Sequence, residues 1–297
     1  MMYYYHPSYS ELDLPERHRF PIQKYQLLKE QLSHFIDDDF FITPKQANKE
    51  HLALCHDQHY IDAFLAGTLA PKAIKKMGFP WSESLVERSL YSVGAAIQGA
   101  EYSLKHGAAF NLSGGYHHAF SDYGSGFCIF NDLAIAAAHL IQTEQADTVV
   151  IFDCDVHQGD GTAEIINQHE QIISCSIHCE QNFPRIKQCS NYDFSLEHGT
   201  KDSDYLKAVQ QAFELTTRLH QPDIILYNAG ADIFSDDELG HFSVSLSGVY
   251  QRDHFVLSQA KAHNIPIFAA LGGGYQRNTE RLVNVHKQLF KAAVDLF

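Results

Sequence analysis

The sequence predicts a single α/β domain, 1–297, built on a mainly parallel central β-sheet with helices on both faces. From about residue 148 onward, short β-branched or apolar runs alternate with longer segments of helical spacing. This alternation is typical of a parallel sheet that helices cover on both sides. His, Asp and Gly also cluster just after several of the runs, where the loops of an open α/β sheet converge on a ligand. No repeat or linker marks a domain boundary.

The individual elements follow from the spacing of apolar residues. Buried strands are expected at 148–153, 172–177, 223–228 and 265–271, and shorter strands at 2–5 and 108–112. Helices are expected at 22–36, 83–105, 132–144, 161–169, 202–220, 246–263 and 277–296.

Composition limits the classes of function. The chain has 297 residues, with 22 Lys+Arg and 36 Asp+Glu, and its net charge is −14. A field of that sign repels phosphate backbones and anionic lipids, and no apolar stretch reaches the length of a membrane span. We therefore expect a cytoplasmic protein with no direct nucleic-acid partner and no membrane partner. The six cysteines lie mostly in apolar runs without CxxC pairs, which favours reduced thiols.

Metal-ligand residues follow two of the expected strands. Asp153, Asp155 and His157 alternate along one extended segment, so their side chains can converge. Asp232 follows another strand among small residues. A site of Asp155, His157 and Asp232 has three protein ligands and leaves coordination positions open, as catalytic zinc sites do. The alternative for each acidic residue is a helix cap or a turn.

Acid–base residues lie in the neighbouring loops. His117 and His118 follow two glycines, and paired imidazoles beside a metal can divide general base and general acid work. Each needs a carboxylate to fix its tautomer, and Asp153 and Asp160 are the two free acidic residues of the metal loop. Tyr275 ends a Gly-rich turn, where a phenol can stabilise an oxyanion. The chain's 19 histidines leave surface decoration as the alternative for the pair.

The channel to such a site is expected to be apolar and narrow. Gly126 and Phe127 precede a helix cap, and Phe183 lies in a loop after the 172–177 strand. Phenylalanines at this position can line a pocket, and we expect Gly126 and Gly273, which lies in the turn before Tyr275, to line the same channel. Core packing is the alternative for both phenylalanines.

With these motifs in order, the sequence resembles the histone deacetylase family of zinc-dependent acyl-lysine hydrolases, which have the arginase/deacetylase fold. The likeness covers nearly the whole chain through GYHHAF, GFCIFND, DCDVHQGDGT, NAGADIF and GGGY. NLSGGYHHA and HCEQNFP most resemble the class IV branch and its bacterial relatives.

The resemblance assigns roles to residues. It implies zinc on Asp155, His157 and Asp232, a general base and acid at His118, and electrostatic tuning by His117. Asp153 and Asp160 then match the carboxylates behind the two histidines, and Tyr275 matches the oxyanion donor. A family potassium site implies backbone oxygens of Asp153, Asp155 and His157 with Ser176, next to Ile177.

The implied substrate is an acylated lysine in a peptide or protein, with an acylated polyamine as the alternative. The overall negative charge would attract cationic groups beside the acylated nitrogen. Fe²⁺ remains an alternative metal for the same ligands. A binuclear manganese ureohydrolase is disfavoured because Phe234 stands where a further carboxylate is needed, and a silent acyl-lysine-binding module is disfavoured because every site position is filled. The family's acidic rim residue has no match, and 67–85 departs in length. Acyl length and oligomeric state are left open.

Overall fold

The computed structural model describes residues 1–297 and contains one eight-stranded sheet. Its strands, all parallel, lie in the order β2-β1-β3-β8-β7-β4-β5-β6. They are β1 (Met2–Tyr4), β2 (Phe41–Ile42), β3 (Ala108–Asn111), β4 (Val149–Asp153), β5 (Ile172–Cys179), β6 (Tyr192–Leu196), β7 (Ile224–Asn228) and β8 (Ile267–Ala270). The predicted α/β class with a parallel sheet is confirmed.

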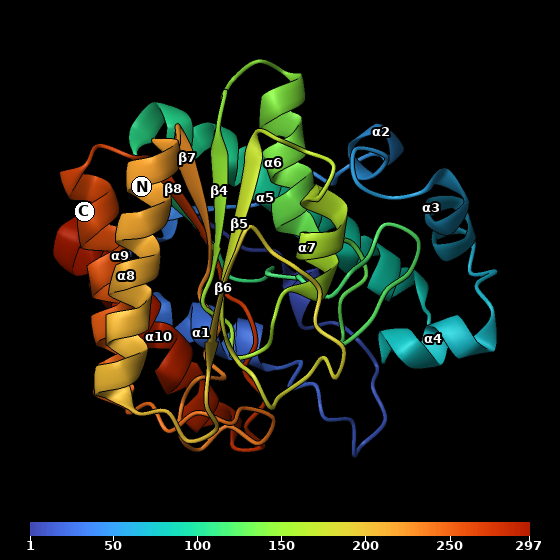
Figure 1. Ribbon diagram of the computed structural model, residues 1–297. Helices are drawn as coiled ribbons and strands as arrows, with labels where there is room; N and C mark the ends of the chain where they lie inside the picture. The colour runs from blue at the N-terminus through green and yellow to red at the C-terminus, as the bar shows by residue number, and fades with distance from the viewer.

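Helices cover both faces of the sheet, as Figure 1 shows. On one face α9 packs against α8 and α10, and α1 packs against α10; on the other, α5 packs against α6. The smaller α2, α3 and α4 extend from the far side of the second layer in Figure 1. The helices are α1 (Lys24–Leu32), α2 (Lys49–Leu52), α3 (Gln58–Leu65), α4 (Pro71–Met77), α5 (Glu83–His106), α6 (Asp132–Gln142), α7 (Asp160–Ile166), α8 (Asp202–His220), α9 (Leu246–Ala262) and α10 (Thr279–Leu296).

The central strands form because they are apolar on both faces. Every residue of β3, β4, β5, β7 and β8 is buried, as expected for strands between two helical layers. The main core contains 80 buried residues. The strands and helices predicted from apolar runs are confirmed, with ends that shift by a few residues.

Sequence patterning missed the two edge strands and the three small helices. The edge strand β2 has only two residues, and the other edge strand, β6, alternates half-buried and exposed positions. Helices α2 and α4 have four and seven residues, too short for a periodic signal. Helix α4 lies in the 67–85 segment whose length departs from the resembled family.

The carboxyl ends of the central strands lie at one level. In the sheet register, Asp153 at the end of β4 pairs with Asn228 at the end of β7, which pairs with Ala270 at the end of β8. Ala270 also pairs with Asn111, the last residue of β3. The four loops rich in His, Asp and Gly therefore begin side by side, as the sequence predicts.

Candidate active site

Asp155, His157 and Asp232 form a cluster with metal-ligand geometry. One donor atom from each lies within 4.8 Å of the others. Nδ1 of His157 faces both carboxylates, at 2.9 Å from Oδ1 of Asp155 and 3.2 Å from Oδ2 of Asp232. The three residues are at most 6% exposed. The loops that follow β4 and β7 supply these ligands.

Backbone groups hold the two carboxylates in place. Oδ1 of Asp232 accepts a hydrogen bond from the Val156 amide at 3.0 Å, and Oδ2 of Asp155 accepts one from the Gly273 amide at 2.8 Å. A Cβ on Gly273 would lie 2.0 Å from Oδ2 of Asp232 and 2.5 Å from Oδ2 of Asp155. Position 273 therefore requires glycine, because any side chain there would occupy the space between the carboxylates.

The donor set fits a divalent cation. Oδ2 of Asp232 is buried and accepts no hydrogen bond; its polar neighbour is Nδ1 of His157 at 3.2 Å, and a buried carboxylate oxygen is costly to leave without a hydrogen bond. Burial and the neighbouring Asp155 charge raise the pKa of Asp232 to about 7 in the metal-free protein. Two carboxylates and one imidazole suit zinc, and several other divalent ions as well. A bound cation would satisfy the unpaired oxygen and offset the repulsion.

His117 and His118 each have a carboxylate behind the ring. Nδ1 of His117 lies 2.6 Å from Oδ2 of Asp153, and Nδ1 of His118 lies 2.6 Å from Oδ1 of Asp160. Both histidines are buried, and their ring centroids are 4.1 Å apart. Each carboxylate accepts from Nδ1 and so leaves Nε2 for chemistry.

The two rings have opposite shifts in pKa. Burial lowers the pKa of His117, but the charges of Asp153 and Asp155 outweigh burial and raise it to about 9. Burial and the charge of His117 lower the pKa of His118 to about 4, against the opposing effect of Asp160. At neutral pH the metal-free pair therefore has one cationic ring and one neutral ring.

Tyr275 lies beside this group on the loop after β8. Its ring centroid is 6.2 Å from that of His157 and 5.8 Å from that of Phe127. Burial and the charges of Asp155 and Asp232 raise its pKa well above the usual value, so the hydroxyl keeps its proton and can donate it in a hydrogen bond. Asp237 fixes the loop, because its Oδ2 accepts from the Tyr275 amide at 2.7 Å.

A channel of about 390 Å³ leads from the surface to this group. Phe183 stacks edge-on against His118 with ring centroids 4.8 Å apart, and it is 43% exposed. The residues that line the channel are Arg19, His118, Gly126, Phe127, His157, Asn182, Phe183, Glu238, Leu239, His241 and Tyr275. The structure therefore brings Gly126, Phe127 and Phe183 together here, whereas Gly273 lines a small internal cavity behind Tyr275.

The residues of the expected potassium site lie on neighbouring segments, but the Ser176 hydroxyl contacts His178. Asp153 at the end of β4 pairs in register with Ser176 of β5, and Ile177 follows in the same strand. Oγ of Ser176 is 3.0 Å from Nδ1 of His178. The potassium site stays a prediction.

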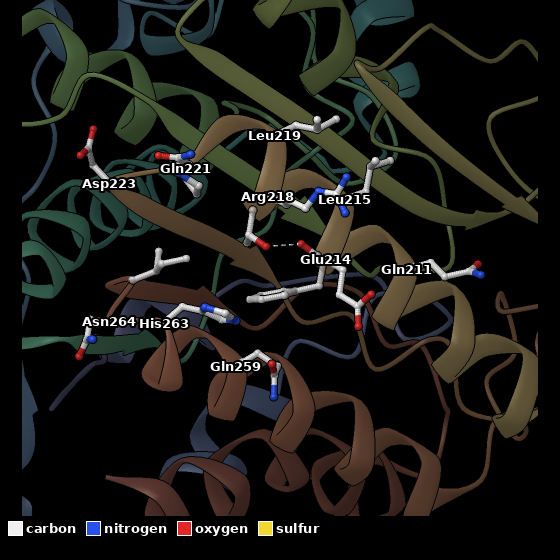
Figure 2. Close-up of a pocket in the computed structure, with 14 residues that line it drawn as sticks. Gln211, Glu214, Leu215, Arg218, Leu219, Gln221, Asp223, Gln259, His263 and Asn264 are labelled. Carbon is white, nitrogen blue, oxygen red and sulfur yellow. Dashed lines mark hydrogen bonds between the residues drawn. The ribbon is translucent and has the colours of Figure 1, made fainter.

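A larger cavity, about 910 Å³, lies at the opposite end of the strands, between the carboxyl ends of α8 and α9 and next to the segments that lead into β7 and β8 (Figure 2). We call it the amino-end groove, because it borders the segment that leads into β7. Its lining residues include Glu214, Arg218, Asp223 and His263. In Figure 2 these polar side chains spread around the groove without meeting at a common point, so size alone does not mark this cavity as the reactive site.

Sequence reasoning missed several residues that support the site. Nδ2 of Asn228 donates to Oδ1 of Asp153 at 2.9 Å, and Oδ1 of Asp132 accepts from the Tyr116 amide at 2.8 Å. Nζ of the buried Lys24 reaches the Gly274 carbonyl at 3.3 Å. Asn228 and Asp132 lie within the motifs, at a strand end and a helix start, but Lys24 lies in a loop-to-helix segment with no local signal.

Comparison with known proteins places this geometry in a family. The model of the histone deacetylase domain matches residues 18–290. The chain belongs to the histone deacetylase family. It is 41% identical to an uncharacterised protein of Picosynechococcus sp. over 99% of this chain and 98% of that protein. It is 31% identical to the histone deacetylase clr6 of Schizosaccharomyces pombe over 81% of this chain and 64% of that protein.

A solved structure supports the fold over the full length. An acetylpolyamine aminohydrolase from Burkholderia pseudomallei superposes with a TM-score of 0.78 at 20% identity, covering 100% of this chain and 99% of that one. Family membership and the ligand cluster together make the protein a deacetylase-like, metal-dependent amidohydrolase.

No helix combines the length and the apolar character that a membrane span needs.

Proposed function

We propose that the protein hydrolyses the amide bond of an acylated lysine, using the metal-ligand cluster, the histidine pair and Tyr275. The observation that carries this proposal is the position of His118. Its ring lines the channel while Nδ1 is held by Asp160, beside the cluster of Asp155, His157 and Asp232. Zinc bound to the cluster would polarise the amide carbonyl and lower the pKa of water.

The two histidines would divide the proton transfers. A neutral His118, whose pKa is lowered to about 4, accepts the proton of the attacking water through Nε2 and then returns it to the departing amine. The charges of Asp153 and Asp155 raise the pKa of His117 to about 9 in the metal-free protein, and a protonated His117 would stabilise developing negative charge. Pairs whose environments push their pKa values apart are typical of divided acid–base roles.

Tyr275 would stabilise the tetrahedral intermediate. The hydroxyl keeps its proton because its pKa is raised well above the usual value, and it can donate a hydrogen bond to the oxyanion. Asp237, which accepts from the Tyr275 amide, would hold the loop in register. Such a donor typically contributes about 3 kcal/mol to transition-state stabilisation.

The test is a panel of acyl-lysine peptides, from acetyl to myristoyl, with acetylpolyamines alongside and bound metal quantified in the same samples. We expect hydrolysis that a chelator abolishes and a hydroxamate inhibits. Full activity of the His157→Ala variant would contradict the proposal. The panel also tests acyl length and the proposed zinc against Fe²⁺; these and the class IV likeness stay predictions.

Acylpolyamine hydrolysis is the second candidate. It is favoured by the full-length likeness to the acetylpolyamine aminohydrolase structure. The same reacting groups serve either substrate, so the choice lies in how the entrance of the channel recognises the rest of the molecule.

A further inference from the structure

The entrance of the channel differs in charge from the rest of the chain. Arg19 and Glu238 are the arginine and glutamate residues among its lining, whereas the protein as a whole has a net charge of −14. Nε of Arg277 lies 3.1 Å from Oε2 of Glu238, and the Arg277 amide donates to Oε1 at 3.2 Å. The Glu238 charge is therefore already compensated.

Arg19 has no such partner. The ion pairs that involve Lys and Arg in the structure do not include Arg19, and its side chain is exposed. It lies in the segment before α1 and lines the channel together with Asn182 and Phe183. An uncompensated guanidinium with five donors suits a carboxylate.

A second cavity of about 710 Å³ adjoins the entrance. The two cavities share Arg19, Glu238, Leu239 and Tyr275, so they lie on either side of these residues, and Arg19 borders both. This adjoining cavity adds Arg17, also outside every ion pair, and Glu16. Its polar lining and its arginines suit an anionic part of the substrate.

We propose that Arg19, assisted by Arg17, binds a carboxylate of the substrate next to the acylated amine, so that acidic acyl-lysine substrates are preferred over cationic ones. The proposal rests on the proposed function. Local charge at the entrance decides recognition, because solvent screens exposed charges beyond about 8–10 Å at physiological salt. The overall acidity of the chain, which by itself favours a cationic substrate, acts only at longer range.

Matched acetyl-lysine peptides that differ at one flanking residue, Asp, Ala or Lys, test the proposal. For the wild type we expect kcat/KM to be about fivefold higher with Asp than with Lys, the effect of roughly 1 kcal/mol from an exposed charge pair. Arg19→Gln should remove most of this preference through KM with kcat unchanged, and Arg19→Glu should reverse it. Arg218→Gln in the amino-end groove is the matched control and should keep the preference.

The source of the carboxylate needs two further substrates. Free Nε-acetyl-lysine, compared with its α-carboxamide, tests whether a substrate's own carboxylate serves, and acetylspermidine tests the cationic alternative. A preference for the Asp peptide or for the free acid, lost in Arg19→Gln, supports the proposal for that source. Faster hydrolysis of acetylspermidine or of the Lys peptide, or an unchanged preference in Arg19→Glu, overturns it. Absence of turnover with every substrate would instead overturn the proposed function.

Discussion

The cavity at the carboxyl ends of the strands and the cavity at their amino ends differ greatly in character. The amino-end groove is larger, about 910 Å³ against 390 Å³ for the channel, and Leu219 on its wall is 56% exposed. Its Asp223 is already used by the backbone, because Oδ2 accepts from the Asp147 and Thr148 amides at 2.8 and 2.9 Å. Asp232, at the carboxyl ends of the strands, is fully buried, and its Oδ2 accepts no hydrogen bond and lies 3.2 Å from Nδ1 of His157.

This contrast teaches how to recognise the reactive edge. The groove has the larger volume, but a buried carboxylate oxygen that accepts no hydrogen bond indicates a ligand, because such an atom is otherwise unfavourable. In the groove the Thr217 hydroxyl, too, is satisfied locally, because it donates to the Phe213 carbonyl at 2.7 Å. Convergent side chains with unsatisfied polar atoms are a better criterion for a reactive site than cavity volume.

Removal of a carboxylate from the cluster should give the largest effect. We expect Asp232→Asn to weaken metal binding and to lower kcat/KM by at least about 10²-fold, the upper end of the effect of outer-shell partners. Metal analysis and a deacylation assay measure this, with circular dichroism as the folding control. The matched variant Asp223→Asn in the groove should retain both metal and activity; if it lost them equally, the contrast between the edges would be wrong.

Loss of the phenol should reduce turnover without affecting the metal. Tyr275→Phe should lower kcat by about 10²–10³-fold, as for removal of one oxyanion donor, while bound metal is unchanged. An activity within twofold of the wild type would remove Tyr275 from the proposed mechanism.

Loss of a carboxylate behind the histidine pair should have an intermediate effect. Asp160→Asn keeps the size of the side chain but removes the charge that orients Nδ1 of His118, and we expect kcat to fall about 10–100-fold. The pH profile of kcat should change as well, because Asp160 opposes the lowering of the His118 pKa. An unchanged rate and profile would show that Asp160 does not act through His118.

The reactive edge should also carry a cost in stability that depends on pH. Burial lowers the pKa of Lys24 to about 8, below its unfolded value of about 10.4. Between these values the unfolded chain binds more protons, so the free energy of unfolding should rise with pH, by up to about 3 kcal/mol.

Denaturant titrations at pH 7.5 and 10 measure this cost. Lys24→Met should lack the rise, so that the stability of the wild type relative to this variant increases with pH. Lys291→Met, at an exposed position, should follow the wild type. An identical pH dependence in wild type and Lys24→Met would contradict the prediction.

The smallest effect is expected in the amino-end groove. Glu214→Gln and Arg218→Gln should each change the free energy of unfolding by less than about 0.5 kcal/mol, as surface substitutions generally do, and leave kcat/KM unchanged. Loss of activity in either would show that the larger cavity takes part in the reaction.

The sequence predicted the parallel sheet and brought the metal ligands and histidine pair to one edge, because these residues directly follow apolar strands. It did not reveal Lys24 or Asp237, whose roles depend on contacts between segments distant in the chain. Nζ of Lys24 meets the Gly274 carbonyl 250 residues away. Glu238 pairs with Arg277 and so leaves the charge of Arg19 free. The sequence did not reveal this either, because it depends on how the loops fold.

The order of the strands has a consequence for the dynamics of the protein. His117, the metal ligands and Tyr275 follow β3, β4, β7 and β8, which occupy the inside of the sheet, whereas the short β2 and the half-exposed β6 form its edges. Local opening starts where burial is poorest. Amide hydrogen exchange should therefore be fast in β2 and β6 and slowest in the four strands that carry the reactive loops, so that fluctuations at the edges leave the catalytic geometry intact.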